Sequence, residues 1–436
     1  MAEMKDSGVA WINTIPKEWK LKKIKYALKN RNENNNPIRS KNILSLTAKQ
    51  GVIPLEEKEG GGNKPKEDYS AYKLAYPNDI VMNSMNVLSG SVGLSKYFGC
   101  VSPVYYMLRP IDEKDDVRYY NYIFQTTVFQ RSLLGLGNGI LMKESDNGKL
   151  NTIRMRIPLD KLGNLLIPVP DSSIQRKIAD YLDSIIPDID MLLADIEKQI
   201  ETLEEYKKSI ITEAVTKGLD PDVEMKDSGI SIIGQIPRHY KLIPLKYMVD
   251  YNSETLPDGT ENDYEFDYID IGSVTYGRGI EQLQRMKFKD APSRARRVVK
   301  KDDVILSTVR TYLKATAAIP SNNYPVIVST GFITLTAKKE LFPNYLKYAI
   351  QYDGFISDVE SRSVGISYPA INSTEAVRIK IIVPPINEQK EISLFLDKKC
   401  TDIDEAINDK KQQLETLEQY KKSLIYEYVT GKKEVQ

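Results

Sequence analysis

The sequence contains very few of the residues that build metal sites and disulfides. One histidine, His239, serves all 436 residues, and the only two cysteines are Cys100 and Cys400. A single histidine excludes a His-rich metal site and leaves little choice of general base near neutral pH. Two cysteines so far apart in the sequence predict reduced thiols in the cytoplasm rather than a disulfide framework.

Long hydrophobic runs and cofactor loops are missing as well. No stretch of about 18 apolar residues occurs, which predicts that the chain does not enter a membrane, and the first residues lack the pattern of a secretory signal. The glycine-rich segment 135–144 lacks the Gly-Lys-Ser/Thr ending of a phosphate-binding loop. These absences predict a cytoplasmic chain with no metal, no cofactor and no catalytic centre of its own.

The chain does contain an internal repeat. EMKDSG at residues 3–8 returns at 224–229, and ETLEEYKKSIITEAVT at 201–216 returns as ETLEQYKKSLIYEYVT at 415–430. The offset of about 214 residues is far longer than the period of a solenoid. The repeat therefore predicts a duplicated domain pair with an approximate internal two-fold axis, which would suit a bipartite partner.

Each half has the same predicted plan, a mixed domain followed by a helical segment. Short apolar runs broken by Gly, Pro and Asn predict strands, and longer runs between them predict helices. Strands are expected within 74–83, 96–110, 165–170, 300–309, 324–336 and 377–385, and helices within 119–134 and 343–359. The first half has about a dozen extra residues around Met142 to Arg156, which we interpret as a loop insertion.

The two helical segments carry apolar residues at steps of three and four, typical of a coiled-coil stripe. Pro187 and its counterpart Thr401 suit the first turn of a helix. We therefore expect long helices to begin there, after shorter helices at 173–184 and 388–399, and to end at Gly218 and Gly431. Two helices related by an internal two-fold must run antiparallel.

These patterns predict an α+β fold with two globular domains that contain small sheets. A pair of long antiparallel helices would separate the two domains as a coiled-coil-like spacer. The predicted boundaries are 1–170 for the first domain, 171–218 for the central helical region, 219–384 for the second domain and 385–436 for the C-terminal helical region.

Polar and basic side chains gather near the ends of the predicted strands. Residues 285–301 carry eight positive charges against one Asp, a pattern typical of phosphate binding. Arg, Asn, Ser and Lys are also the residue types that read base edges, although many such residues only satisfy turns. The candidate DNA-binding residues are Asn83, Ser84, Asn86, Arg131, Asn138, Lys143, Arg294, Arg296, Arg297, Thr308, Arg310, Arg362, Ser363 and Tyr368.

One motif resembles a known family. Val383 to Ile392 reads VPPINEQKEI, which is similar to the Pro-Pro-x-x-Glu-Gln-x-x-Ile signature of the specificity subunits of type I restriction–modification systems. The repeated Leu-Glu-x-Tyr-Lys-Lys-Ser and the order domain, helix, domain, helix also resemble that family. The first copy departs from the signature, because residues 168–178 keep Gln175 and Ile178 and replace the Glu.

The resemblance implies two target-recognition domains, each reading one half of a split double-stranded DNA target. Helices of the predicted length would place the two domains about one duplex turn apart, which predicts a fixed gap. Because the two domains differ in sequence, different half-sites are expected. The resemblance implies no cofactor in this chain. Two methyltransferase subunits would carry S-adenosylmethionine, and restriction subunits would carry the ATP- and Mg-dependent motor and nuclease. The implied residues for helix pairing or methyltransferase docking are Leu203, Tyr206, Lys207, Lys208, Leu417, Tyr420, Lys421 and Lys422.

Two alternatives stay open at this point. The first is a coiled-coil scaffold with two protein-binding domains, which would show no salt-dependent affinity for DNA. The second is a stand-alone nuclease, because PDVEMK at residues 221–226 superficially resembles a nuclease Asp…Glu-x-Lys set. That set requires carboxylates on separate strands, whereas this string is only the start of the second repeat.

Overall fold

The computed structural model describes residues 3–47, 50–58, 65, 67–86, 90–139 and 155–435 of the chain. The chain divides into two compact units, and each is described by itself. Unit 1 joins Met1–Asp195 to Leu414–Gln436, and unit 2 is Ile196–Gln413. Each unit therefore combines a β-rich domain with one part of each long helix.

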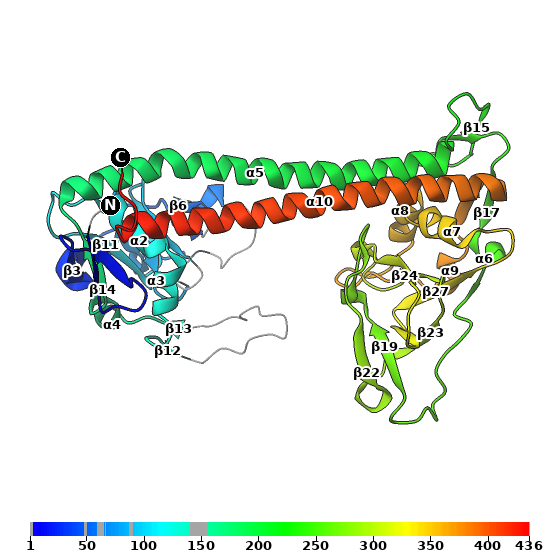
Figure 1. Cartoon of the computed structure of the whole chain (residues 1–436), viewed down its shortest axis with the longest axis horizontal. Coiled ribbons are helices and arrows are strands. Elements are labelled where there is room, and N and C mark those ends of the chain that lie inside the picture. Colours follow the sequence, from blue (N-terminus) through cyan, green and yellow to red (C-terminus); the bar gives the residue numbers. More distant parts are fainter. Residues whose placement is uncertain are drawn as a thin grey trace. The chain divides into compact units, whose positions relative to one another are not determined.

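The long helices are α5 (Ser172–Lys217) and α10 (Ile386–Val429), and each is continuous (Figure 1). The prediction of separate short helices before Pro187 and Thr401 was wrong, because both segments belong to the long helices. Pro187 lies on an exposed turn of α5, so the carbonyl that loses its helical donor can bond to water. Thr401 does not cap a helix, because its hydroxyl donates to the Asp397 carbonyl one turn earlier at 2.8 Å.

Within each unit, a segment of α5 runs antiparallel to a segment of α10. In unit 1 the rings of Tyr181 and Tyr428 lie 4.5 Å apart, and Asp190 forms an ion pair with Lys421. In unit 2 Lys207 bonds Asp404 at 2.6 Å, while Lys217 lines the same cavity as Glu391. The predicted antiparallel pairing is confirmed inside both units.

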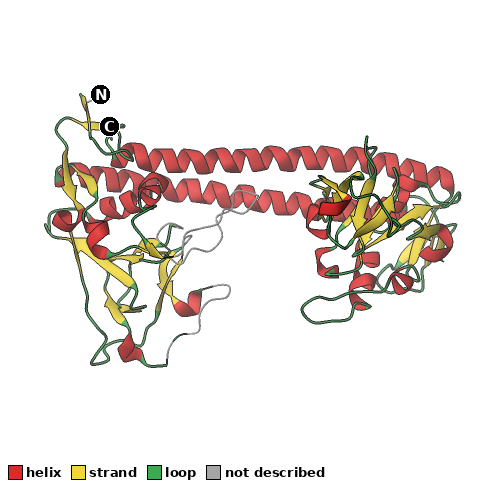
Figure 2. Ribbon diagram, turned by 90° about the horizontal axis from the view of Figure 1, so that it is seen from below, coloured by secondary structure: helices red, strands yellow, loops and turns green. Residues whose placement is uncertain are grey.

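The first sheet has the same strand order in both units. Figure 2 draws the strands as yellow arrows. In unit 1 the order is β4 (Leu28–Asn30), β11 (Tyr105–Pro110), β8 (Ile80–Asn83) and β9 (Val92–Leu94). In unit 2 it is β18 (Val249–Tyr251), β27 (Phe332–Ala337), β24 (Val304–Ser307) and β25 (Thr316–Ala318). All neighbours are antiparallel.

The second sheet is continuous in unit 2, where its order is β22 (Gln284–Lys287), β19 (Glu265–Ile269), β26 (Val326–Ser329) and β23 (Ala295–Val299). Unit 1 has two hairpin-like pairs in the matching places, β6 (Gly51–Pro54) with β5 (Leu44–Thr47), and β10 (Gly99–Val101) with β7 (Lys73–Ala75). A parallel bridge between Ile43 and Cys100 links these pairs, as β19 and β26 are linked in parallel in unit 2. The strands that the sequence predicted are confirmed.

Helices cover the sheets where the sequence placed them. These are α2 (Val117–Gln125) and α3 (Thr127–Ser132) in unit 1, and α7 (Pro343–Ala349) and α8 (Asp353–Ser361) in unit 2. The remaining short elements of unit 1 are β1 (Met4–Asp6), β2 (Thr14–Pro16), β3 (Lys20–Lys23), α1 (Ile24–Ala27), β12 (Asn138–Gly139), β13 (Met155–Arg156), α4 (Leu159–Gly163) and β14 (Leu166–Val169). Those of unit 2 are β15 (Met225–Asp227), β16 (Gln235–Pro237), β17 (Lys241–Pro244), α6 (Leu245–Met248), β20 (Val274–Thr275), β21 (Gly279–Ile280), α9 (Ser373–Ala376) and β28 (Lys380–Val383).

The repeated opening motif receives the end of a long helix in each unit. Gly431 (φ +69°) ends α10, and a Cβ there would lie 2.6 Å from the ring of Pro16. Gly218 (φ +78°) ends α5, and a Cβ there would lie 2.5 Å from the Tyr240 hydroxyl. The sequence predicted both helix ends. Glycine is needed at each for two reasons: the backbone has a positive φ, and a Cβ would collide with a neighbouring side chain.

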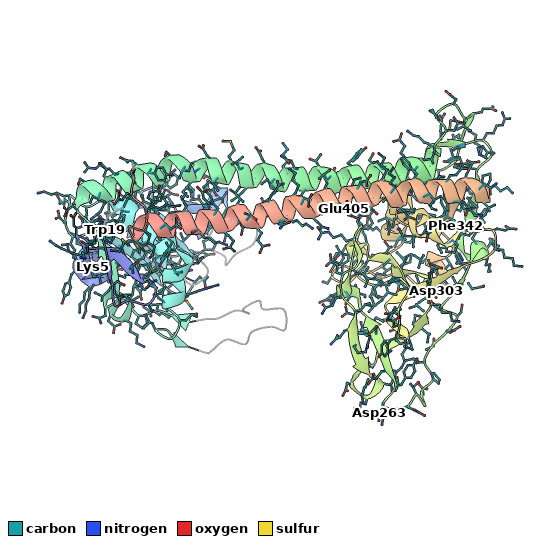
Figure 3. The ribbon with its side chains drawn as sticks, in the orientation of Figure 1. Lys5, Trp19, Asp263, Asp303, Phe342 and Glu405 are labelled. Atoms are coloured by element: carbon teal, nitrogen blue, oxygen red, sulfur yellow. The ribbon has the colours of Figure 1, made fainter. Side chains whose placement is uncertain are left out.

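The repeated Gln of the signature motif fixes where each long helix begins. Gln389 accepts from the backbone N–H of Phe342, labelled in Figure 3, at 2.8 Å and donates to the Pro384 carbonyl at 2.8 Å. Gln175 makes the same two bonds in unit 1, to Asp116 at 3.1 Å and Pro170 at 2.9 Å. Both side chains are buried, so these bonds satisfy groups that water cannot reach.

Among the described residues, no helix is both long enough and apolar enough to cross a membrane.

Candidate nucleic-acid interface

A hydroxyl at the end of the central strand anchors the next turn in each unit. Ser84, after β8, donates to the Val104 carbonyl at 2.7 Å, and Thr308, after β24, donates to the Gly331 carbonyl at 2.9 Å. Both side chains are buried, as is the preceding Asn83, which accepts from the N–H of Met85 at 3.0 Å. These three predicted site residues therefore bond the backbone and position the turns that follow them.

The anchored turn joins a second loop by the same bond in both units. The Ser84 carbonyl accepts from the N–H of Ile157, and the Thr308 carbonyl accepts from the N–H of Ile371, both at 2.9 Å. The turn after β8 thus lies beside the segment that follows α3, and the turn after β24 lies beside the segment that follows α8. We name each such pair of loops the tip of its unit.

The tip of unit 2 brings together most of its predicted residues. Exposed Arg310 has a left-handed backbone (φ 51°), and its guanidinium lies 5.1 Å from the ring centroid of Tyr368. Thr311 donates to the Ser363 hydroxyl at 2.8 Å, which holds the two loops side by side. Arg362 is instead engaged by Asp358 through two bonds of 2.7 and 3.1 Å.

The tip of unit 2 also exposes large apolar side chains that the sequence did not single out. Tyr312, Val364 and Ile366 all face solvent, and Ile366 is fully exposed. Residues of this kind contact thymine methyl groups and stack on bases. No local signal in the sequence distinguishes them, because their exposure depends on the two loops being joined.

The tip of unit 1 has the same framework with different side chains. Exposed Asn86 lies in the turn after β8, and exposed Arg131 lies in the last turn of α3. The backbone of Asn138 pairs with Arg156 in the β12–β13 ladder. The predicted insertion falls between these strands, and Lys143 lies outside the described residues.

The basic strand β23 and the residue before it supply three arginines with no carboxylate partner among the described residues. Arg294 is exposed, and Arg296 lies 4.9 Å from the Phe288 ring centroid. The Nε of Arg297 is buried without a hydrogen bond in the described structure, and burial lowers the pKa of this guanidinium. A buried donor of this kind is a candidate for a phosphate or base partner.

Arg294 lies near the tip of unit 2. Its carbonyl accepts from the N–H of Thr330 at 2.9 Å, and the carbonyl of the next residue, Gly331, receives the Thr308 hydroxyl. One β-turn therefore connects the start of the basic strand to the tip. The backbone of Arg294 therefore lies close to the strand end that anchors Thr308, two residues before Arg310.

Other cations of the predicted basic run are neutralised. The hydrogen bond of 2.6 Å from Arg285 lowers the pKa of buried Asp267. The Arg285 guanidinium also lies 3.5 Å from the centroid of the Tyr324 ring. Lys287 pairs with Asp263, labelled at one end of the strands in Figure 3, at 3.5 Å. The basic footprint is therefore smaller than the sequence suggested.

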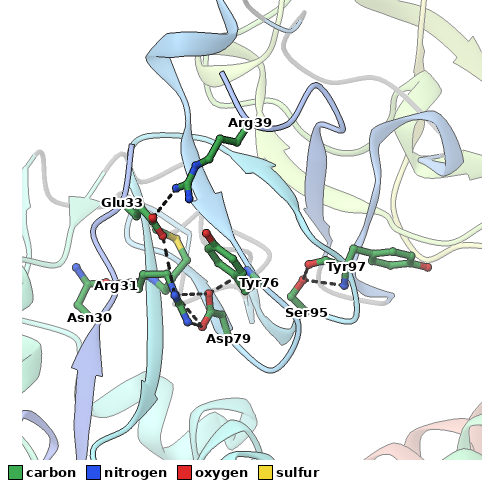
Figure 4. Close-up of polar contacts among 9 residues, drawn as sticks. Asn30, Arg31, Glu33, Arg39, Tyr76, Asp79, Ser95 and Tyr97 are labelled. Carbon is green, nitrogen blue, oxygen red and sulfur yellow. Dashed lines mark hydrogen bonds and ion pairs between the residues drawn. The ribbon is translucent and has the colours of Figure 1, made fainter. Parts of the chain in front are cut away.

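Unit 1 has a comparable internal network, shown in Figure 4. Arg31 bonds Asp79 at 3.1 Å and lies 4.2 Å from the centroid of the Tyr76 ring, while Arg39 pairs with Glu33. Burial raises the pKa of Asp79 even though Arg31 opposes this. These cations hold the fold and are not free for a nucleic acid.

The eight helix residues divide by exposure. Lys207 and Lys421 each pair with an aspartate of the other helix, Asp404 and Asp190. Leu203 and Leu417 are partly buried, and Leu417 packs against the core of unit 1. Tyr206, Tyr420 and Lys422 are exposed and Lys208 is half-buried, so these side chains remain available to a partner.

The single histidine takes part in a structural contact. His239 lies 2.8 Å from Glu388, which also accepts from the buried Tyr240 hydroxyl at 2.9 Å. In the described parts of the chain, no cluster of three or more His, Cys, Asp or Glu could hold a metal ion.

Comparison with known proteins shows which proteins this chain is similar to. Residues 238–416 match the family model described as the type I restriction modification DNA specificity domain. The chain is 27% identical over 277 residues to the type I restriction enzyme MjaVIII specificity subunit of Methanocaldococcus jannaschii, covering 62% of each chain. It is 28% identical over 284 residues to the MjaX specificity subunit of the same organism, covering 62% of this chain and 60% of the relative.

One solved structure covers nearly the whole chain. It comes from a study of complex assembly and conformational transition of the type I R-M system, and covers 96% of this chain and 99% of its own, with a TM-score of 0.66 and 13% identity. This likeness concerns the fold. The aligned regions span only about three fifths of the curated relatives' own length.

The fold and the match define a chain with two repeated units, the second of which contains a DNA specificity domain. The chain as a whole is similar to type I restriction enzyme specificity subunits.

Proposed function

We propose that this chain is a non-catalytic DNA-binding subunit in which each unit reads one half of a bipartite, gapped target. The main support for this proposal comes from a comparison of the two tips. The same two hydrogen bonds build both of them, on Ser84 and Thr308, whereas the side chains that they expose differ. A shared framework with different exposed residues suits two different half-sites.

The chemistry of the tip in unit 2 supports contact with bases. The planar guanidinium of Arg310 can form two parallel bonds to guanine O6 and N7, and Tyr368 holds it from one side. Arg294, Arg296 and Arg297 would then bind phosphates and fix the orientation of the unit on the duplex. In unit 1, Asn86 takes the place of Arg310, two residues after the anchoring hydroxyl, and Arg131 is exposed in the last turn of α3.

The continuous helices support a gap of fixed length. Since α5 and α10 each belong to both units without a break, the two half-sites would be read by domains joined through a helix pair. Two modules linked in this way bind as one bivalent ligand, so each needs only a few base contacts.

The catalytic steps would belong to partner subunits. Two methyltransferase subunits carrying S-adenosylmethionine would dock on the helices, for which exposed Tyr206, Tyr420 and Lys422 and half-buried Lys208 are the candidates. Restriction subunits would supply the ATP- and Mg-dependent motor and nuclease. With them the assembly would act as a type I restriction endonuclease and adenine-specific DNA methyltransferase in the cytoplasm.

A genome-wide map of methylated bases tests the proposal. The cognate methyltransferase is expressed with and without this chain in the same host. A split, gapped motif that appears only with the chain supports the proposal. If the methyltransferase is present and folded but no motif depends on the chain, the DNA-reading function is wrong and the scaffold alternative gains support.

A further inference from the structure

The same strand position carries a half-buried cation in both units. Lys73 in β7 pairs with Val101 on β10, and Arg297 in β23 pairs with Val328 on β26. The strands β10 and β26 occupy matching places in the two units, and each of the two valines is followed by a serine. Lys73 and Arg297 are therefore counterparts, although their side chains differ.

The backbone on the other side of each strand supports this equivalence. Each cation forms an isolated bridge with a third segment, Lys73 with Asn34 and Arg297 with Thr255. In both units the N–H of the residue after the cation donates to the carbonyl of the glutamate before that bridge partner, at 2.8 Å in unit 1 and 3.1 Å in unit 2. The fold thus holds both cations in the same backbone register.

Neither cation has a carboxylate partner among the described residues. There, Lys73 Nζ bonds only the Tyr105 carbonyl, at 3.4 Å, and the Nε of Arg297 is buried without a hydrogen bond. Burial lowers the pKa of both side chains, and the charge of Arg156 lowers that of Lys73 further. The internal networks of both units, by contrast, neutralise their arginines with buried aspartates. A half-buried charge without a partner costs stability, so its presence at both matched positions points to an anionic ligand.

In unit 1 this cation lines a cavity of about 490 Å³ beside the tip. The N–H of Ile157, which follows Arg156, bonds the Ser84 carbonyl of the tip at 2.9 Å. Two cations and two amides face one carboxylate in this cavity, and these residues are Lys73, Arg156, Asn30, Asn32 and Asp160. The charges and the amide groups suit an anion with several oxygen acceptors.

In unit 2 the cation lies on the strand that begins beside the tip. Arg297 follows Arg294 by three residues, and the Arg294 carbonyl bonds the N–H of Thr330 at 2.9 Å. Its strand partner Val328 precedes Gly331, whose carbonyl receives the Thr308 hydroxyl, by three residues. Both cations are therefore connected to the tip of their unit through a few backbone bonds.

We propose that Lys73 and Arg297 each bind one phosphate of the DNA backbone, at the same position relative to the half-site that their unit reads. Arg156 would bind the same phosphate as Lys73 in unit 1. The inference rests on the proposed function and deepens it, because it assigns one matched backbone contact to each unit. A phosphate supplies both the negative charge and the acceptor oxygens that the two cations lack.

The matched positions favour the DNA backbone over base edges. The backbone is the same at both half-sites, whereas base contacts have to differ between two different half-sites. The two cations belong to the framework that the units share, and the residues that differ between the units lie on the tips. A phosphate also binds Lys and Arg alike through their charge, so it tolerates the change from Lys73 to Arg297.

Removing each charge gives the first test. The chain assembled with its methyltransferase is titrated with a duplex that carries the mapped target, and failure of this wild-type complex to bind would contradict the proposed function itself. Lys73→Met and Arg297→Met are each expected to bind about tenfold more weakly. The slope of log affinity against log salt should become smaller by about one. Lys73→Arg restores the charge and should recover most of the loss.

The melting temperature separates ligand binding from a structural role. Removal of a half-buried charge without a partner should leave the melting temperature of Lys73→Met equal to that of the wild type or raise it. The matched control is Lys114→Met. Lys114 is an exposed lysine beyond the end of β11 opposite the tip, and its removal should leave the affinity unchanged. A lower melting temperature for Lys73→Met, wild-type affinity for that variant, or equal losses in Lys73→Met and Lys114→Met would each overturn the proposal.

Neutral phosphates in the DNA give the second test. Each phosphate of the target is replaced in turn by a methylphosphonate, which carries no charge. One replacement beside one half-site should weaken the wild-type complex but not Lys73→Met, and the matching replacement beside the other half-site should weaken the wild-type complex but not Arg297→Met. Methylation mapping should show an unchanged motif for both variants. If no replacement behaves in this way, the cations do not contact the backbone, and if the motif is relaxed at one base pair, they read a base. Either result would contradict the proposal.

Discussion

The two units share a framework and differ in the side chains that they expose. Buried Gln175 and Gln389 make the same bonds at the start of the long helices. Ser84 and Thr308 make the same bonds under the tips. The tips themselves expose Asn86 and Arg131 in unit 1, but Arg310, Ile366 and Tyr368 in unit 2. Stability and recognition thus depend on separate sets of residues, so each set can change without the other.

The largest expected effect comes from the framework glutamines. Gln389→Ala leaves the N–H of Phe342 and the carbonyl of Pro384 buried without partners, and should lower the free energy of unfolding by about 3 kcal/mol. Gln175→Ala should have a similar effect in unit 1. Chemical denaturation measures both variants, with exposed Lys390→Ala as the control on the same helix. Effects that differ by several-fold would contradict the equivalence of the two frameworks.

The second prediction separates the tips from the framework. Arg310→Ala should remove about 1 to 3 kcal/mol of discrimination at one position of one half-site, with no loss of stability because Arg310 is exposed. Methylation mapping should show one half of the motif relaxed and the other unchanged. Arg362→Ala is the matched control, since that arginine is engaged by Asp358. Relaxation of both halves would break the assignment of one half-site to each unit.

The third prediction concerns a place where the frameworks differ. The Tyr240 hydroxyl is buried and bonds Glu388, while the corresponding residues of unit 1 are Trp19 and Ile174. Glu388→Ile should therefore lower the stability of unit 2 by about 1 kcal/mol, because the hydroxyl loses its acceptor. Adding Tyr240→Phe should recover most of this loss. A double-mutant cycle measured by thermal denaturation checks it, and strictly additive losses would contradict the coupling.

The smallest expected effect is a pair of opposite pH dependences. Arg285 lowers the pKa of Asp267 in unit 2, so the stability from this carboxylate is present above its unfolded pKa of about 3.9 and is lost as the pH falls through its folded value. Burial raises the pKa of Asp79 in unit 1. Its contribution is therefore largest at low pH and is lost as the pH rises through its folded value.

Urea denaturation between pH 3 and pH 6 tests this pair. The stability difference between wild type and Asp267→Asn should shrink as the pH falls, whereas the difference for Asp79→Asn should change in the opposite direction. If both stability differences changed with pH in the same direction, the direction assigned to one of the two pKa shifts would be wrong.

The sequence predicted the helices, most strands and the internal repeat because these depend on local periodicity and on the comparison of one half with the other. It did not predict that α5 and α10 are continuous, since the effect of Pro187 depends on which face of the helix meets solvent. It did not predict the β20–β21 hairpin either, because two strands of two residues carry almost no periodic signal.

The candidate site was predictable by residue type but not by role. Thr308 and Arg310 are two positions apart, yet one is buried beneath the tip and the other lies on it. Arg285 and Arg294 belong to the same basic run, yet only Arg285 is neutralised, by a carboxylate that is distant along the chain. Such distinctions depend on strand pairing, which the sequence does not display.

The packing of the two helix ends gives the chain a cyclic order. Gly218 meets the start of the second repeat, and Gly431, near the C-terminus, meets the start of the first at Pro16 and Trp19. The end of each long helix therefore packs against the start of a repeat in the same way, so the packing does not distinguish which repeat comes first in the chain. A chain cut after Gly218 and rejoined from residue 435 to residue 3 by a short linker would contain every contact described for both units, with the second unit translated first.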